Sequence, residues 1–386
     1  MGSARPVHAT TATSALLAGA LVLCLAAAGG ASPNRIAALG GESRFLLDAT
    51  NVHEYPALAV SLGHAGLELY DEWGGAVLPL GRGAVGLYAN RPSAPLRRYN
   101  AWIDALGLRP LARLDVQPWI EAVAGLRLDG DRAVGLKLCH AADLDETAAG
   151  EASASLSHVA AGLRLGPGHR RVDLALHLRR YRLRDRTVSP SRRQSDGDAL
   201  ALQARGRWQV GEGLLAVPVV AVETGSLGLA PATGERRRLQ VGLALNARPT
   251  ASVLAVAGLL VDHESTRQES PAGPRLDQWT AALPALVGGA EVHVGSLTFR
   301  AGLRHEAVRA QTESLNAGGQ VVRTRTFDAG MRTDVGLGMV FGDLRLDGVL
   351  EKDFLRDGPH FIGGSRRGGG LFANLSLEYL LGRGSR

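Results

Sequence analysis

The sequence predicts an all-β protein: a transmembrane antiparallel β-barrel of about 14 strands, within a range of roughly 12 to 16, and a short N-terminal hatch segment. Three observations support this fold class. An apolar N-terminal run has the features of an export signal, alternating apolar and polar residues recur along most of the chain, and several alternating runs are long. Among the 386 residues 45% are hydrophobic, which excludes a long disordered chain. Only one run approaches the roughly 20 apolar residues of a spanning helix, which excludes a helical multi-span protein.

Residues 1–31 are predicted to be a cleavable signal peptide. Arg5 and a Thr-rich stretch without acids precede the apolar run 14–28, and small residues follow it. This run is shorter than the roughly 20 residues of a membrane anchor. Once the signal is removed, Cys139 is the only cysteine left, which excludes an intrachain disulfide and a thiolate zinc cluster. We therefore expect an exported protein without disulfides.

Residues 64–386 are predicted to form the barrel, because β-like stretches separated by turn signals recur about every 20 to 25 residues. They begin near Leu67, Val85, Ile120, Val134, Val159, Val172, Leu200, Val217, Leu239, Val253, Leu283, Leu297, Phe327, Leu344 and Leu371. Single-chain bacterial barrels use an even number of strands, and we therefore prefer 14.

Six of these stretches alternate clearly between an apolar and a polar face: 172–178, 200–210, 239–247, 297–303, 327–341 and 344–350. Their apolar faces hold 31 positions without one Asp, Glu, Lys or Arg, whereas nine of the 25 interleaved positions are charged. Side chains alternate across a strand, so each strand needs one apolar and one wet surface. An exported soluble β-protein would also have two such faces. The 15-residue run 327–341 favours the membrane barrel, since soluble strands cluster near five or six residues.

The polar faces are expected to line the lumen. The predicted pore-lining residues are Arg171, Asp173, His177, Arg179, Arg205, Arg207, Arg300, Arg332, Asp334, Arg345, Asp347 and Glu351. Bases dominate the stretches near Val172 and Leu200, and acids those near Phe327 and Leu344. Opposite walls are therefore expected to carry opposite charge and to tune ion selectivity. Alternatively, these charges only solvate the inner wall.

Residues 32–63 are predicted to form a hatch or plug ahead of the first strand. They contain Leu39-Gly40-Gly41, then Asp48-Ala49-Thr50-Asn51, then Tyr55-Pro56-Ala57-Leu58. This order resembles the entry motif of the FadL-like and PorV-like outer-membrane barrels, in which a Gly-Gly element, an Asp-rich stretch and an Asn-Pro-Ala-type element precede the first strand. The resemblance implies a 14-stranded barrel with a hatch that folds inward and uses Gly40, Gly41, Asp48, Asn51, Tyr55 and Pro56. The alternative is an ordinary turn before the first strand.

The sequence does not predict an enzyme, because it lacks Gly-x-Ser-x-Gly, His-Glu-x-x-His and P-loop motifs. We therefore assign no catalytic residue, metal site or cofactor. Arginines spread over many strands argue against nucleic acid as a partner. The predicted function is a passive, porin-like channel or transporter for small or hydrophobic solutes in the outer membrane of a Gram-negative cell. A PorV-like accessory barrel that binds another exported protein is the alternative. The expected partners are outer-membrane lipid and the barrel-assembly machinery.

Overall fold

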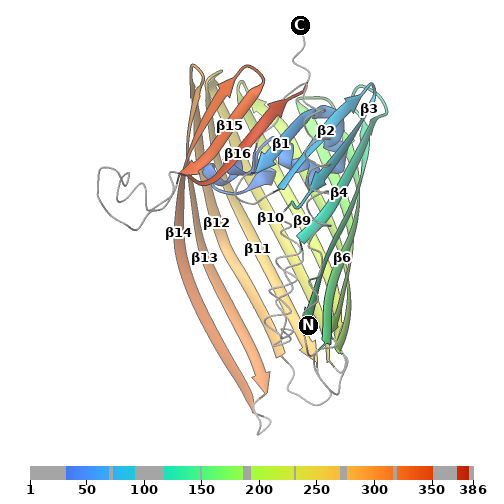
Figure 1. The fold of residues 1–386 in the computed structure, drawn as a ribbon. Helices are drawn as coiled ribbons and strands as arrows, with labels where there is room; N and C mark the ends of the chain where they lie inside the picture. The colour runs from blue at the N-terminus through green and yellow to red at the C-terminus, as the bar shows by residue number, and fades with distance from the viewer. Residues whose placement is uncertain are drawn as a thin grey trace, which may run out of the picture.

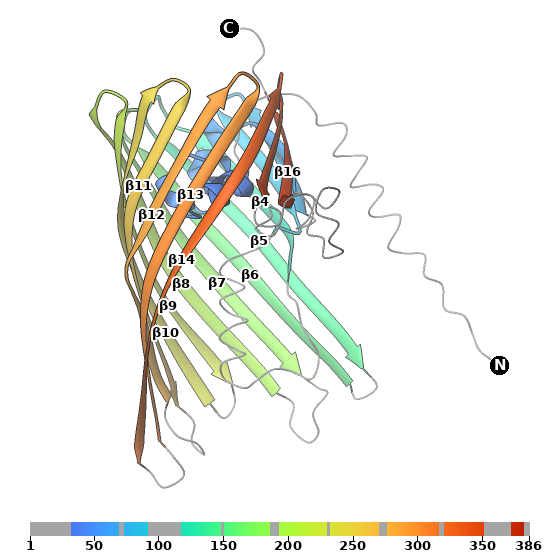
Figure 2. The same ribbon diagram turned by 90° about the vertical axis from the view of Figure 1, so that its left-hand side faces the viewer.

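The computed structural model describes residues 32–68, 73–91, 117–147, 150–185, 193–229, 232–269, 276–315, 320–350 and 372–381. Within them, sixteen strands form one closed antiparallel barrel in which strands adjacent in sequence pair and β1 closes against β16 (Figures 1 and 2). The predicted all-β barrel is confirmed. The preferred count of 14 strands is wrong, and so is the count implied by the FadL-like and PorV-like resemblance. The predicted signal peptide lies outside the described residues.

The strands are β1 (His64–Glu68), β2 (Trp73–Leu80), β3 (Gly83–Ala89), β4 (Gln117–Arg127), β5 (Ala133–Thr147), β6 (Gly150–Leu165), β7 (Arg170–Asp185), β8 (Arg193–Gly211), β9 (Leu214–Leu229), β10 (Ala232–Thr250), β11 (Val253–Glu269), β12 (Leu276–Val294), β13 (Leu297–Leu315), β14 (Val321–Phe341), β15 (Leu344–Leu350) and β16 (Phe372–Leu380). In this part of the chain no helix has both the length and the apolar character needed to cross a membrane.

The strand that the sequence did not predict is β2. Its sequence, WGGAVLPL, contains two adjacent glycines and a proline, which are depleted in strands and hide the alternation. Trp73 and Val77 nevertheless point inward and are buried. Each of the other strands contains or borders one of the predicted starting points. The missed β2 therefore accounts for one of the two strands by which the preferred count is too low, and the other is lost where fifteen candidates are reduced to an even number.

The barrel has two different ends. At one of them, called the turn end, the strands are joined by residues 81–82, 128–132, 166–169, 212–213, 251–252, 295–296 and 342–343. The connections at the opposite loop end lie almost wholly outside the described residues. Strands β5 to β14 have 15 to 21 residues, whereas β1, β2, β3, β15 and β16 have 5 to 9. One side of the strand wall is therefore much taller than the other (Figure 1).

The outer face of the wall carries an apolar belt. In one of its rows Leu178 pairs with Val159 and Leu200, and in the next row toward the turn end Val222 pairs with Leu202 and Leu239. These side chains are exposed on the outside, Leu202 by 54%. The next outward row toward the loop end is polar: Ser157, Arg180, Asp198, Ser226 and Glu235. All six apolar faces predicted from the sequence point outward, as the alternation requires.

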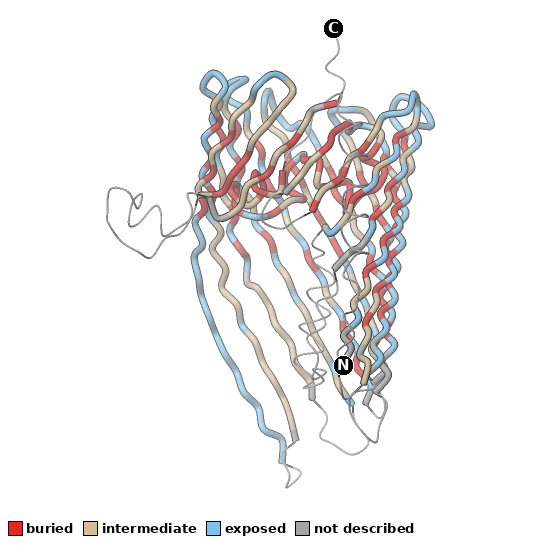
Figure 3. The backbone as a smooth tube through the Cα atoms, viewed as in Figure 1, coloured by how far each residue is buried: buried red, intermediate tan, exposed pale blue. Residues whose placement is uncertain are grey.

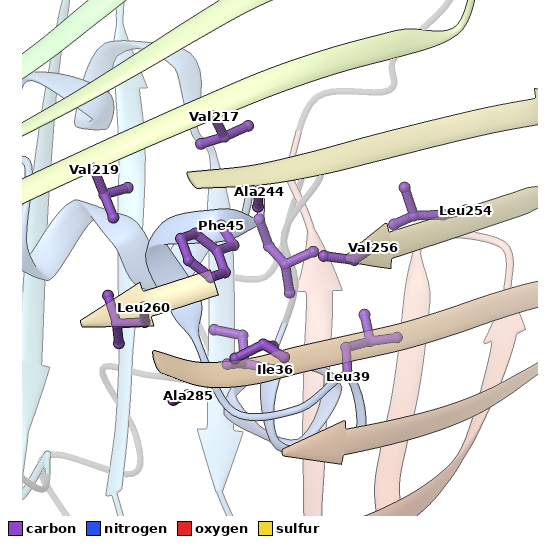
Figure 4. Packing of buried hydrophobic residues seen from close by; sticks show 12 residues of the cluster. Ile36, Leu39, Phe45, Val217, Val219, Ala244, Leu254, Val256, Leu260 and Ala285 are labelled. Carbon is purple, nitrogen blue, oxygen red and sulfur yellow. The ribbon is translucent and has the colours of Figure 1, made fainter. Parts of the chain in front are cut away.

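Residues 32–62, called the inner segment, fill the lumen near the turn end (Figure 2). The segment contains α2 (Pro33–Ala38), η1 (Ser43–Phe45), η2 (Ala49–His53) and η3 (Pro56–Ser61). Buried residues concentrate at its level in the barrel (Figure 3). Ile36, Leu39 and Phe45 pack against the inner face of β9 to β12 (Figure 4). The main apolar core of the described chain therefore lies between this segment and the wall.

Local sequence explains the short helices of the inner segment. The Ser32 side chain accepts a hydrogen bond from the backbone N–H of Arg35, and Pro33 occupies the first turn of α2. Asp48 and Asn51 form a capping box around η2. Gly40 and Gly41 follow α2 at φ of 94° and 77°, a conformation that side chains disfavour. The Gly40-Gly41 pair thus forms the turn after α2, and Asp48 begins η2.

Candidate functional site

Glycines on the inner face of the wall let the inner segment approach the strand backbones. A Cβ atom at Gly302 would lie 2.4 Å from the backbone nitrogen of Gly40, and one at Gly135 would lie 2.3 Å from that of Ala57. At Gly258 it would lie 2.6 Å from the ring of Phe45. Any side chain at these positions would displace the segment, so these glycines form sockets for it.

Buried ion pairs attach α2 to the wall. The Arg35 guanidinium donates to both carboxylate oxygens of Glu291 at 2.7 and 3.0 Å and to Asp48 at 3.2 Å. Arg300 of β13 donates to Glu291 and to Asp347, each at 2.7 Å. All five side chains are shielded from solvent, so the charges compensate one another in a medium where an unpaired charge is costly.

A second buried cluster holds the middle of the segment to β7 and β8. Arg205 donates to Asp173 at 2.7 Å, to Asn51 Oδ1 at 2.7 Å and to the backbone oxygen of Leu46 at 3.1 Å. Its guanidinium also lies 4.8 Å from the centre of the Tyr55 ring. Arg164 donates to the other oxygen of Asp173. The wall therefore forms hydrogen bonds with both the side chains and the backbone of the segment.

A third contact joins η2 to β4 and β5. His53 and Lys137 both contact the carboxylate of Glu121, and Lys137 also donates to the backbone oxygen of His53. Arg91 lies 3.1 Å from Glu121. Burial, together with the positive charge of Arg91, lowers the pKa of His53 from 6.5 to about 3. His53 is therefore neutral at pH 7, and the two bases compensate Glu121.

The predicted hatch residues come together in the inner segment. Gly40 and Gly41 form one turn, Asp48 and Asn51 cap η2, and Tyr55 lies fully buried under Arg205. Pro56 follows directly and lies against the sockets at Gly135 and Gly162.

The predicted pore-lining residues lie on inward-facing positions of their strands, except Glu351, which lies outside the described residues. Asp173, Arg205, Arg300 and Asp347 are buried beneath the inner segment, each exposed by 2% or less. Arg171, Arg207 and Arg345 lie toward the turn end, and His177, Arg179, Arg332 and Asp334 toward the loop end. The expected segregation of charge between opposite walls stays a prediction; within each wall the structure pairs both signs, Arg205 with Asp173 and Arg300 with Asp347. Compensation across neighbouring strands lowers the cost of burying these charges.

The inner segment separates two cavities. The larger, of about 480 Å³, faces the loop end and is lined by Arg44 and Glu54 of the segment and by Lys137, His177 and Arg179 of the wall. The smaller, of about 290 Å³, faces the turn end and includes Leu47, His169, Gly213 and Arg248. The described chain therefore has a lumen that is blocked between two open spaces.

Several residues of this site were not predicted from the sequence: Arg35, His53, Glu121, Lys137, His158, Arg164 and Glu291. A usable signal exists for some of them, since Lys137 alternates with Leu136 and Leu138, and Glu121 with Ile120 and Ala122. A charged residue between two apolar, outward-facing ones marks an inward position. Within the described residues, no three His, Cys, Asp or Glu side chains are arranged to hold a metal ion.

No family model and no curated protein matches the sequence. Among solved structures, the chain is similar to the siderophore receptor PirA from Acinetobacter baumannii, with a TM-score of 0.40 and 10% identity over 75% of this chain and 62% of that one. It is also similar to the ferric yersiniabactin uptake receptor FyuA from Yersinia pestis, with a TM-score of 0.39 and 13% identity over 69% and 51%. The copper transporter OprC gives a TM-score of 0.39 at 10% identity over 74% and 59%. The chain spans about half to two thirds of the length of these structures, and the likeness is one of general shape that identifies no family.

Proposed function

We propose that the chain is an integral outer-membrane β-barrel of a Gram-negative cell and a passive channel for small solutes, with the inner segment as its plug. The observation that carries the proposal is the position of the segment: it lies between a cavity of about 480 Å³ on the loop side and one of about 290 Å³ on the turn side. A solute that crosses the barrel must pass this segment.

The outer face supports the membrane location. A closed barrel satisfies its backbone hydrogen bonds internally, which lipid requires. The apolar outer face of β8 runs from Trp208 to Leu200. At about 3.4 Å per residue and a tilt of about 40°, it rises roughly 20 Å, close to the roughly 25 Å apolar band of such barrels. Short turns face the periplasm in these proteins, so we assign the turn end to the periplasm and the loop end to the exterior.

The contacts of the inner segment support a plug that moves. It is joined to the wall by discrete ion pairs and glycine sockets as well as by the apolar contacts of Ile36, Leu39 and Phe45, and the ion-paired groups that separate when it moves are polar on both sides. Arg35 and Glu291, for example, can each be hydrated once apart. Movement of the segment would join the two cavities into one path.

Conductance in planar bilayers tests this proposal. The variant Arg35→Ala removes the ion pairs of α2 and should raise conductance above that of the wild type. A second variant adds Asn34→Cys and Ser376→Cys, two positions whose side chains lie 3.1 Å apart across the segment and β16. Oxidation should lower the conductance of this variant and a reductant should restore it. The conductance of Arg35→Ala alone should change with neither treatment.

If the wild type and both variants resist carbonate extraction but none of them conducts, the channel is excluded. An exported protein that co-purifies with such a silent barrel would favour the accessory role. Extraction of the wild type by carbonate would exclude the membrane location itself.

A further inference from the structure

We propose that the larger cavity is a binding site for a small solute that carries an oxyanion, a carboxylate or a phosphate, on a hydroxylated body of about sugar size. This inference rests on the proposed function, because it names the class of solute that the channel admits. Its basis is a group of buried basic side chains with an unused hydrogen-bond donor.

The group comes from three adjacent strands. On the inner face, His158 of β6 pairs with Arg179 of β7, and Ala160 of β6 separates Lys137 of β5 from His177 of β7. These four basic or imidazole side chains are each exposed by 4% or less, and all of them line the cavity. The neighbouring inward residue Ala201 is small and also lines the cavity, so the space in front of the group stays open.

One atom of this group has no partner within the described chain. Arg179 uses Nη1 to donate to Glu223 at 3.0 Å, but its Nε–H is buried and unpaired. His177 Nδ1 lies 3.0 Å from His158 Nε2, and the His177 ring also has a hydrogen bond with the backbone of Glu54. A guanidinium is always protonated and donates only, so Arg179 Nε–H requires an acceptor. An oxyanion supplies this acceptor.

Two unpaired acceptors complete the site. Glu54 Oε2 of the inner segment and Gln203 Oε1 of β8 are buried without a partner, and both residues line the cavity. They require donors, which the hydroxyl groups of a solute supply. Because Glu54 belongs to the segment, a solute bound here would contact both the wall and the plug.

The fixed charges of the cavity favour an anion. Six bases line it: Arg44, Arg91, Lys137, Arg179, Arg238 and Arg304. Four acids line it: Glu42, Glu54, Glu223 and Asp262. Glu121 and Glu306, which pair with Arg91, Lys137 and Arg304, do not line the cavity, so bases outnumber acids at its surface and attract anions. The volume of about 480 Å³ lies within the roughly 300–1,000 Å³ of small-molecule sites.

Isothermal titration calorimetry on the purified full chain in detergent tests the site with three probes of equal size: gluconate, glucose and glucosamine. Gluconate should bind at least ten times more tightly than glucose, and glucosamine should not bind. Arg179→Gln should weaken gluconate binding at least tenfold. Arg180→Gln is the matched control, because this arginine of the same strand points outward and does not line the cavity; it should change the affinity less than twofold. Ala201→Leu, which fills the space without removing charge, should also abolish binding and covers the case that Arg179→Gln does not fold.

Equal affinity for gluconate and glucose, or an equal loss in the two arginine variants, would overturn the anion site. Absence of heat with all probes, while conductance still depends on the plug, would overturn the site and leave the channel intact. If the barrel binds gluconate selectively but never conducts, the binding site is supported and the proposed channel function is excluded.

Discussion

Arg205 Nη1 lies 2.7 Å from Asn51 Oδ1, and this hydrogen bond joins the eighth strand of the wall to the centre of the inner segment. Both side chains are fully buried or nearly so. Asn51 also accepts from the backbone N–H of Asp48 and donates to the backbone oxygen of Ser43, so its amide organises the segment that Arg205 holds. The wall and the inner segment are thus stabilised by one polar network.

Arg205→Ala should destabilise the barrel by about 3 to 5 kcal/mol, because it breaks a buried ion pair with Asp173 and removes one of the two donors to Asn51 Oδ1. A lipid-refolding titration with urea measures this change. Arg180→Ala is the control: its pair with Asp198 is exposed and 3.9 Å long, so it should cost less than about 1 kcal/mol. Equal costs for both variants would contradict the anchoring role of Arg205.

Gly302→Ala should loosen the plug, since the added Cβ would lie 2.4 Å from the Gly40 nitrogen and 2.6 Å from the Ala38 oxygen. Overpacking of this kind costs about 1 to 3 kcal/mol. We expect lower stability together with a higher open probability in bilayer recordings. Gly288→Ala, whose Cβ would meet nothing within 4 Å, should leave both quantities unchanged. If Gly302→Ala has the stability and open probability of the wild type, the socket at Gly302 does not hold the inner segment.

Leu202→Arg should destabilise the barrel by about 2 to 4 kcal/mol, because Leu202 belongs to the apolar outer belt and is 54% exposed there. The control is Ser226→Arg, an outward position in the polar row that faces Asp198 and Glu235; its cost should lie between about 0 and 1 kcal/mol. Refolding into lipid vesicles compares the two. If the arginine is tolerated equally at both positions, the belt is not the lipid surface.

His53 should make the stability depend on pH. Its pKa falls from 6.5 to about 3 in the folded chain. As the pH is lowered, His53 is therefore protonated in the unfolded chain before it is protonated in the folded chain. The contribution of His53 is complete above about pH 6.5 and declines as the pH falls toward about 3. His53→Asn should therefore be less sensitive than the wild type to a change from pH 7 to pH 4, as thermal unfolding at both values would reveal. Parallel losses in the two proteins would assign the effect to other groups.

The alternation of side chains determined the fold class and the apolar outer surface. The period of two is a property of each strand alone, so residues such as Leu174, Leu202 and Leu337 could be assigned to the outside without knowledge of their neighbours. The same rule missed β2, because Gly74, Gly75 and Pro79 conceal its period, and this miss contributed to an expected strand number that was too low.

The sequence by itself also placed Gly40, Gly41, Asp48, Asn51, Tyr55 and Pro56 in one segment ahead of the barrel, through the resemblance of their order along the chain to a known barrel entry motif. Only the tertiary structure decided what this segment touches. Asn51 meets Arg205 from 154 positions away, and Arg35 meets Glu291 from 256 positions away. No local pattern encodes such contacts, since they depend on how the closed sheet aligns distant strands around the lumen. For the same reason, charges that the sequence assigned to a wet inner wall became, in the folded barrel, buried pairs that hold the segment.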